Sequence, residues 1–271
     1  ITGNTQSTMT RVTTSSEANA SPDNILVLAT RENLVNATCV SAAISSSGAD
    51  KLALSGGGTG AENTISGSTE ASMSDSDLRA RGNLSLQASD TSKIGAVLPS
   101  FAVGSGAQGI GIGVAVATNE ISDASTSSFI TRSNAHADGV VSVLATATQE
   151  IKAYVGSIAA LISPAGGTLS AVGSGAHVFN DIAMSVKAEI SNVTKSGLIG
   201  SAVQVLASDT SVLSAACWGV AASFGSTDNF SVGVSLARNT VENEVAAGLR
   251  GMTAIVESRT GNIEVRSQEN A

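Results

Sequence analysis

The chain is poor in the side chains that usually fill or cross-link a globular core. Aromatic residues make up 3% of its 271 residues, with one tryptophan and one tyrosine, and there are three prolines and two cysteines. A large globular core normally uses aromatic rings to fill its volume, whereas a narrow core of stacked Val, Ile, Leu and Ala does not need them. Two cysteines are too few for a disulfide framework.

Charge is also scarce, and this limits the partners that the chain is expected to have. Charged residues make up 13%, against a usual share of about 25%, and the 14 basic residues leave a net charge of −8. This balance gives no electrostatic footprint for nucleic acid and no basic cluster for an anionic membrane surface. The apolar runs are short and interrupted, so we expect no membrane span. No signal peptide is visible at Ile1.

What the sequence does contain is strict alternation. At the start of residues 109–121, Ile110, Ile112, Val114 and Val116 occupy one phase, and Gly111, Gly113, Ala115 and Ala117 the other. A period of two with β-branched residues is typical of a strand. We expect the branched residues Ile110, Ile112, Val114 and Val116 to face the core. The tiny opposite face suggests that another layer lies close against it.

An asparagine recurs at a nearly constant interval. The series Asn4, Asn63, Asn119, Asn180 and Asn239 has spacings of 59, 56, 61 and 59 residues. A second marker, a short alternating segment, begins at Ile25, Leu84, Val141, Val203 and Ile263. A third marker is an alanine downstream of that segment, at Ala37, Ala96, Ala153 and Ala215. Three markers in step indicate an internal repeat of roughly 59 residues.

The repeat predicts one continuous solenoid segment rather than separate domains. Its divisions are 1–62 (partial and irregular), 63–118, 119–179, 180–238 and 239–271 (partial). The third repeat is the longest, with its extra residues near 163–167. Gly173, Gly175 and His177 fall in the expected inward phase of that repeat, which predicts a bulge or looped insertion. No capping repeat is visible, so we expect an excerpt of a longer chain.

These features favour an all-β fold, a parallel β-helix or β-solenoid. Helical repeats are disfavoured by the β-branched, Ser/Thr-rich and Gly-rich strands, and a propeller blade would be shorter and richer in aromatic signatures. A 59-residue unit divides into two turns of about thirty residues or three of about twenty, and the spacing of Ile65, Leu84, Val103 and Ile121 favours three. By analogy with β crossovers we expect a right-handed coil. The recurring asparagine is expected to point inward or to occupy a corner.

The two cysteines test this interpretation. Cys39 and Cys217 occupy the same place in the repeat, three repeats apart. At two or three turns per repeat they would lie roughly 30–40 Å apart, beyond the reach of a disulfide. We therefore predict two free thiols that act as small core hydrophobes. Leu98 and Val155 at the equivalent positions support that role.

No residue is proposed as a catalytic, cofactor-binding or metal-binding group. A GxGxxG match at 104–109 is followed by an alternating strand rather than by the helix that a dinucleotide site needs. His136 and His177 lie at non-equivalent positions. The densest charged cluster, Asp75, Asp77, Arg79 and Arg81, is absent from other repeats. A solvated turn is the favoured interpretation of this cluster, and a cation or sugar site is the alternative.

The segments 114–121 and 135–145 resemble the repeats of giant bacterial filamentous adhesins, the filamentous-haemagglutinin-like and leukotoxin-like surface proteins exported by type V or related routes. The shared motif is a branched–small–branched strand, an asparagine and another branched residue. The resemblance implies a β-helical, extracellular, non-enzymatic shaft at the bacterial surface, without cofactors or catalytic residues.

The first functional hypothesis is accordingly a structural rod or stalk within a very large adhesin or fibre. Its partners would be other segments of the same chain and laterally packed copies, which flat faces such as Gly111 and Gly113 would permit. The alternative is a carbohydrate-active β-helix resembling a lyase or phage tailspike. Such sites use paired carboxylates or a basic residue in a groove, with aromatics for sugar stacking. This chain offers only sparse carboxylates and few rings, among them Tyr154 and Trp218.

Overall fold

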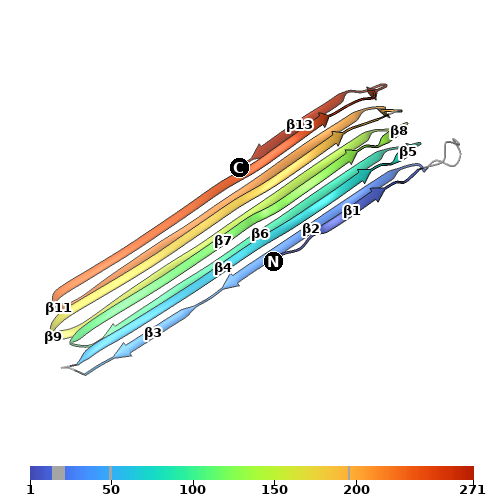
Figure 1. Cartoon of the computed structure of the whole chain (residues 1–271). Coiled ribbons are helices and arrows are strands. Elements are labelled where there is room, and N and C mark those ends of the chain that lie inside the picture. The colour runs from blue at the N-terminus through green and yellow to red at the C-terminus, as the bar shows by residue number, and fades with distance from the viewer. Residues whose placement is uncertain (14–21, 49–50, 195) are drawn as a thin grey trace.

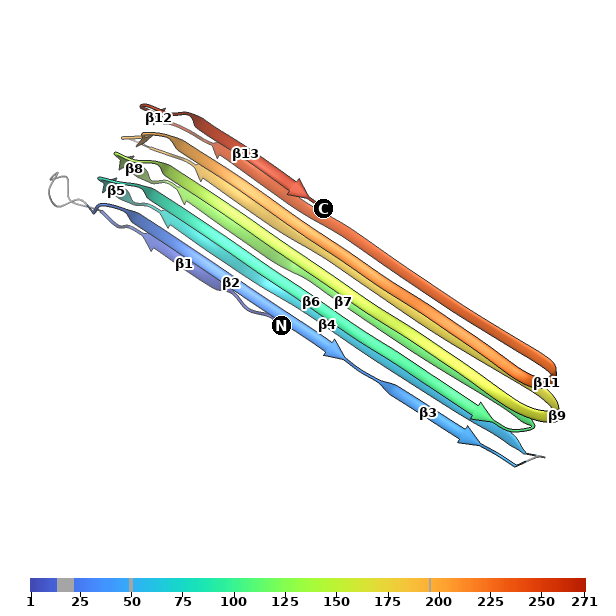
Figure 2. The ribbon, with the colours of Figure 1, turned by 180° about the vertical axis from the view of Figure 1, so that it is seen from behind.

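A computed structural model describes residues 1–13, 22–48, 51–194 and 196–271. Its regular structure consists of strands, and those ranges include no helix. Accordingly, no described helix has the length and apolar character to cross a membrane. Long strands lie side by side in parallel, coil upon coil, as Figures 1 and 2 show from opposite sides. The predicted all-β parallel solenoid is confirmed.

Each coil has two long sides and one short side. We call the first long side the outbound layer, and it contains β2 (Ile25–Thr38), β3 (Ser41–Ser46), β6 (Leu84–Ser105), the first parts of β9 (Val141–Ser191) and β11 (Val203–Arg250), and β13 (Ile263–Asn270). The return layer contains β1 (Thr5–Thr10), β4 (Leu52–Ser74), β7 (Gln108–Thr131) and the remainders of β9 and β11. The short side is a separate sheet of β5 (Asp77–Ala80), β8 (Asn134–Ala137), β10 (Leu198–Gly200) and β12 (Val256–Ser258).

The strand register shows that one repeat makes one coil. Leu84 pairs with Val141, and Val141 pairs with Val203, so residues one full repeat apart are direct neighbours. The expectation of two or three turns per repeat is therefore wrong. The spacing of about nineteen residues does not mark successive turns, because Leu84 and Val103 lie on the same strand β6, and β6 and β7 are 22 and 24 residues long.

The branched residues of the opening strand face outward, contrary to expectation. Ile110, Ile112 and Val114 are 39%, 51% and 42% exposed, whereas the glycines and alanines of the other phase are buried. The layers approach closely here, as the tiny face suggested. A Cβ added to Gly113 would lie 2.6 Å from Ser157 Oγ of the opposite layer. Because Gly111 and Gly113 face the opposite layer, the expectation that they form an outer face for lateral packing is also wrong.

Past Asn119 the large apolar residues change from the outward to the inward phase of the strand, and they fill the interior. Ile121 and Ile130 are completely buried in the return layer, and Leu84, Leu86 and Ile151 are completely or almost completely buried in the outbound layer. They belong to the largest hydrophobic cluster. Burial of one such side chain contributes about 1.5–3 kcal/mol, so this half of each coil supplies most of the hydrophobic stabilisation.

The asparagine is a mid-strand residue that points inward, as one of the two expectations had it, and the alternative corner position is wrong. The Nδ2 of Asn63 donates to Oδ1 of Asn119 (2.8 Å), Asn119 donates likewise to Asn180 (2.8 Å), and Asn180 to Asn239 (2.9 Å). We call this row of amides the Asn ladder. Asn4 is not part of it, because β1 pairs with β4 at an offset of 64 residues and the Asn4 Oδ1 accepts from the Ser68 amide.

The real corners are built from residues in the left-handed region of backbone space. The residue that follows each return strand has a φ between 47° and 56° in five successive coils, at Arg11, Asp75, Arg132, Asn192 and Gly251. This conformation is uncommon for residues other than glycine, with Asn and Asp the most tolerant. The corner is thus set by the coil geometry, since the residue type varies.

The third repeat keeps its register before Asn180. Gly173 and Gly175 project outward, and Val172 and Ala176 are buried, so the bulge expected in this strand is absent. Its extra residues lie at the turn after Ile162, where the pairing with β11 shifts. The expected position of the insertion is confirmed.

The cysteines are free, as predicted, but their setting differs. Leu98 and Val155, which lie between them in the same row, are completely buried. Three coils at about 4.8 Å each separate Cys39 from Cys217 by roughly 14 Å, not 30–40 Å. Cys39 is exposed and is no core residue, whereas Cys217 is half-buried with its thiol 3.5 Å from the Leu236 carbonyl oxygen.

We predict that Asn119→Leu destabilises the stack. The substitution leaves a buried Asn63 donor and a buried Asn180 acceptor without partners, at about 1–3 kcal/mol each. Chemical denaturation measures the loss, and Thr118→Leu, one residue away and facing outward, is the control. Equal midpoints for the two variants would contradict the role of the ladder.

Candidate functional site

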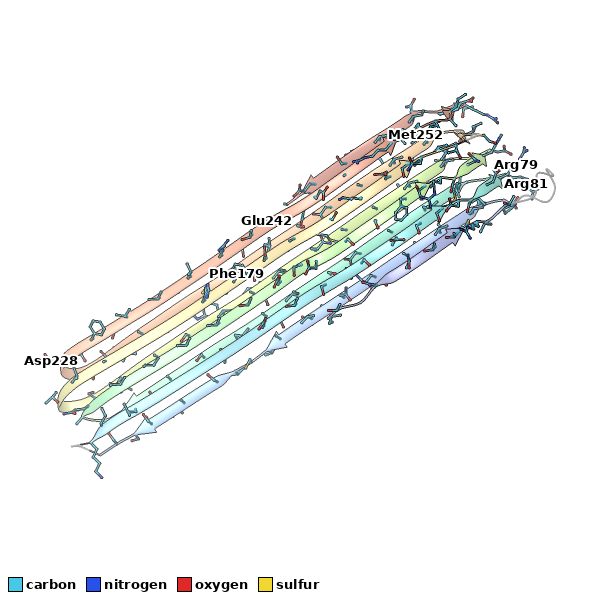
Figure 3. The ribbon with its side chains drawn as sticks, in the orientation of Figure 1. Arg79, Arg81, Phe179, Asp228, Glu242 and Met252 are labelled. Carbon is cyan, nitrogen blue, oxygen red and sulfur yellow. The ribbon has the colours of Figure 1, made fainter. Side chains whose placement is uncertain are left out.

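The charged cluster at 75–81 is divided among separate partners. Asp75 sits at a corner and forms a two-point ion pair with Arg132 of the next coil, with N–O distances of 2.8 and 2.9 Å. Arg81 pairs with Asp23 of the preceding coil at 2.7 Å. Figure 3 shows Arg79 and Arg81 at the short-side end of the coils. The pairing supports a solvated structural turn.

The electrostatics of Asp75 do not suit an acid catalyst. The hydrogen bonds and charge of Arg132 hold the pKa of the Asp75 carboxyl below its ordinary value. A general acid in glycoside hydrolysis needs a raised pKa, so that the carboxyl keeps its proton near neutral pH. The sugar-site alternative therefore gains nothing from this carboxylate.

The two histidines are not brought together. His136 lies on β8 beside Arg79, and His177 lies on the outer face of β9 beside Val116. Burial lowers the pKa of His136, and the nearby charges of Arg259 and Arg79 lower it further. Asp138 stands 3.7 Å from His136 Nε2. Among the described residues, no group of three or more His, Cys, Asp or Glu side chains is placed to hold a metal ion.

The GxGxxG segment forms a turn with strands on both sides. Residues 104–109 end β6, cross to the return layer and begin β7. Gly109 packs against the side chain of Leu161. A strand rather than a helix follows, as the sequence predicted, so the helix N-terminus that would hold a dinucleotide phosphate is missing here.

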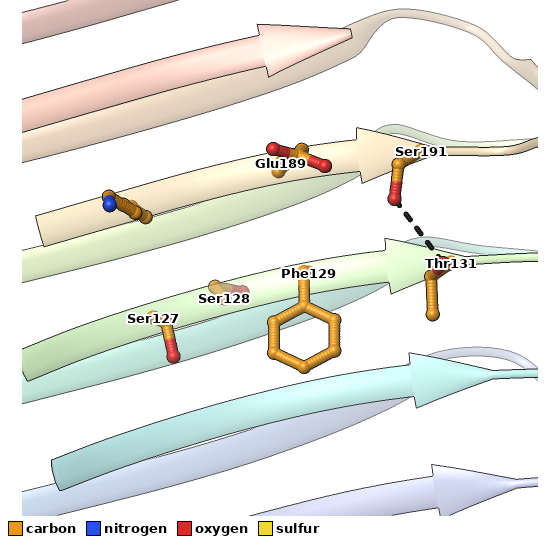
Figure 4. Close-up of a pocket in the computed structure, with 7 residues that line it drawn as sticks. Ser127, Ser128, Phe129, Thr131, Glu189 and Ser191 are labelled. Carbon is orange, nitrogen blue, oxygen red and sulfur yellow. Dashed lines mark hydrogen bonds between the residues drawn. The ribbon is translucent and has the colours of Figure 1, made fainter. Parts of the chain in front are cut away.

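A shallow hollow lies on the outer face of the return layer (Figure 4). Its floor includes Phe129, with Ser127 and Ser128 beside it on β7. Lys187, Glu189 and Ser191 come from β9, and Ser191 Oγ donates to Thr131 Oγ1 at 3.3 Å. Glu189 is also 3.4 Å from the Arg250 guanidinium. One ring and one paired carboxylate line an open surface, and this is not a closed reaction site.

The most elaborate charged networks are inside the solenoid, where the sequence predicted no charged residue. Arg31 Nε and Nη2 donate to the two carboxylate oxygens of Asp90 at 3.2 and 2.7 Å, and both side chains are almost fully buried. Arg31 Nη1 also donates to the carbonyl oxygens of Gly3 and Ser66 in the return layer. The pair therefore ties the two layers of the first coils together. In the sequence, the separation of 59 residues between Arg31 and Asp90, one repeat, was the signal that could have indicated this pair.

A second buried network surrounds Asp209. Its Oδ2 accepts from Ser211 Oγ (2.9 Å) and from Asn243 Nδ2 (2.7 Å) of the opposite layer. Asn243 Oδ1 accepts from the Met184 amide at 3.0 Å. Burial raises the pKa of Asp209, the hydrogen bonds from Ser211 and Asn243 oppose that shift, and the charge of Glu269 adds to it. The network links the outbound and return layers of two neighbouring coils.

We predict that Asp90→Asn is strongly destabilising. It leaves the buried Arg31 guanidinium without its counter-ion, a change that typically costs about 3–5 kcal/mol. Urea denaturation measures it. Asp75→Asn breaks the solvent-exposed pair with Arg132 and serves as the matched control, with little measurable effect expected. Similar losses in both variants would show that burial of the Arg31–Asp90 pair is unimportant.

The raised pKa of Asp209 predicts a pH dependence with a definite sign. The folded state keeps a proton on this carboxyl at pH values where the unfolded chain has released it. Stability therefore falls as the pH rises from the ordinary Asp range through the folded pKa. Asp209→Asn should flatten this slope in thermal unfolding followed at several pH values. Asp138→Asn, an exposed control, should retain it, and an unchanged slope in Asp209→Asn would contradict the assignment.

No family model, curated protein or solved structure matches the chain. The resemblance to filamentous adhesins therefore depends on the sequence motifs alone. Any function has to be argued from the coil geometry and from the surfaces that the coils present.

Proposed function

We propose that the chain is a non-enzymatic structural segment of a very large bacterial cell-surface adhesin or extracellular fibre. The observation that carries the proposal is that like residues of successive coils stack in register, as in the Asn ladder and in the row of Ala96, Ala153 and Ala215. Each coil offers the next a template of paired backbone groups and matched side chains. This construction suits a repetitive scaffold.

The coil geometry defines what kind of scaffold this is. One coil advances the stack by about 4.8 Å along its axis. Each long strand, by contrast, runs for about 75–80 Å at roughly 3.3 Å per residue, since β6 and β7 have 22 and 24 residues. The proposed element is therefore a broad ribbon that grows slowly in length, and not a thin shaft.

Several contacts support a structural use of the charged groups. Glu150 pairs with Lys152 on its own strand and lies 3.7 Å from Lys93 of the preceding coil. Lys187 pairs with Glu244 of the following coil at 2.9 Å. Exposed charges thus link neighbouring coils across the outer faces. The laterally packed copies and the other segments of the same chain remain the proposed partners.

Electron microscopy of the parent protein, together with surface labelling, tests the proposal. We expect ribbons of constant width near 75–80 Å, the length of the long strands at about 3.3 Å per residue. Antibodies raised against this chain should label intact cells that express the parent protein. Compact particles, or labelling only after the cells are permeabilised, would contradict it.

A further inference from the structure

The two halves of each coil, divided by the Asn ladder, have opposite polarity patterns. We call the turn half the part of each coil between the Asn ladder and the turn that joins the outbound layer to the return layer. In this part β7 presents Ile110, Ile112 and Val114 to the outside. Beyond the ladder the same strand buries Ile121 and Ile130. A one-face-buried strand normally keeps a single phase. Because of this change of phase, the turn half carries its branched residues on the outside of the coil.

Both outer faces of the turn half are apolar. On the outbound layer the exposed side chains include Phe101, Tyr154, Ile162, Trp218, Val220 and Phe224, with exposures of 38–59%. On the return layer they include Leu54, Ile112, Phe230, Val234 and Leu236, with exposures of 51–63%. Such contiguous exposed apolar surface on a soluble domain marks an interaction site.

Charge is excluded from this half. The sequence has no Asp, Glu, Lys or Arg between Lys93 and Glu120, and none between Lys152 and Asp181. Figure 3 shows Glu242 partway along the coils and Asp228 at the far end, where the turns lie. Across this surface charges are therefore confined to the border near the Asn ladder and to the turn tips.

The interior of the turn half combines small residues with two small hydrophobic clusters, which include Leu98, Val155 and Leu161. The hydroxyls of Ser45, Ser55, Thr59 and Ser157 are buried without a hydrogen-bond partner. This interior buries fewer large apolar side chains than the interior beyond the Asn ladder. Small residues between closely packed elements and large apolar residues on the outside are the arrangement of proteins in lipid.

The dimensions fit a lipid bilayer. The outward positions from Tyr154 to Ile162, and from Ala216 to Phe224, are all apolar. Nine residues of strand extend about 26–30 Å, close to the hydrocarbon thickness of about 30 Å. In the middle coils every strand has a parallel neighbour on both sides, so backbone groups stay paired as hydrocarbon requires.

An aromatic ring lies on each layer at the border with the charged half, and Tyr154 is of the type enriched at membrane interfaces. Tyr154 lies two residues from Lys152 on the same outer face. Phe179 lies two residues from Asp181, and the Arg238 guanidinium sits over its ring at 5.3 Å from the centroid. The apolar surface thus ends in an aromatic and charged margin on both layers.

We propose that the turn half of the coils inserts into a lipid bilayer and leaves the charged half outside. A second copy of the chain packed against one layer would cover one apolar face and leave the other in water. Hydrocarbon surrounds both faces at once. This insertion does not depend on the proposed adhesin function.

Vesicle flotation with the complete 271-residue chain tests the insertion. The probe is vesicles of zwitterionic phosphatidylcholine, which exclude a purely electrostatic attraction. We expect the chain to float with the vesicles. Trp218, the single tryptophan, should shift its emission to shorter wavelength and be quenched by lipids brominated in their acyl chains.

The decisive variant places one carboxylate on each apolar face, as Ile112→Glu with Val220→Glu. Both positions are about half exposed, so the fold should tolerate the change. The control, Ser127→Glu with Thr148→Glu, adds the same charge to outward positions of the charged half. We expect flotation to fall at least tenfold in the first variant and to persist in the control, with unfolding midpoints confirming that both are folded.

Two outcomes would overturn the proposal. The first is a chain that stays out of the floating fraction at all lipid concentrations and shows no tryptophan shift. The second is a chain that assembles without lipid in sedimentation velocity, with assembly abolished by the Ile112 and Val220 substitutions and no flotation. The second result would assign the apolar faces to another copy of the chain.

Discussion

In-register parallel pairing between residues one repeat apart is the interaction on which the whole structure depends. It places Asn119 between Asn63 and Asn180 and gives the Asn119 amide both a donor and an acceptor. The same pairing satisfies backbone groups in coil after coil, so no compact central core is required. The scarcity of aromatic residues is consistent with this construction, because stacked aliphatic residues such as Leu86 and Ile121 fill the space between the two layers.

The Asn ladder also divides the molecule into two environments. On one side large aliphatic residues such as Ile121 and Leu86 fill the interior, and burial supplies the stabilisation. On the other side the interior holds mainly Gly, Ala and Ser with two small apolar clusters around Leu98 and Leu161, and many large apolar residues face outward. Buried amides at the boundary, together with the Arg31–Asp90 pair and the Asp209 network, connect the layers where the two patterns meet.

The sequence predicted the fold class, the repeat and the matched rows, because all three follow from periodicity. Its errors share one cause: alternation defines two faces but not which face is inside. Ile110 and Ile112 were assigned to the core by hydrophobicity, and only the position of the opposite layer, near Gly113, shows that they face outward. The predicted number of turns per repeat was wrong because the length of a strand is set by tertiary structure. The buried Arg31–Asp90 pair needed the register before its partners could be matched.

Near-identity between coils creates a problem of mistaken partners during folding. A strand that skipped one repeat would still meet Asn with Asn and Ala with Ala, so the ladders alone do not select the correct neighbour. Local irregularities distinguish the coils: the longer turn after Ile162 and the extra residue of β7 near Asp123, which shifts its register with both neighbouring strands, each fit one position in the stack. These departures from the repeat specify which coil pairs with which. A chain from which they were removed would lose the features that keep its coils in order.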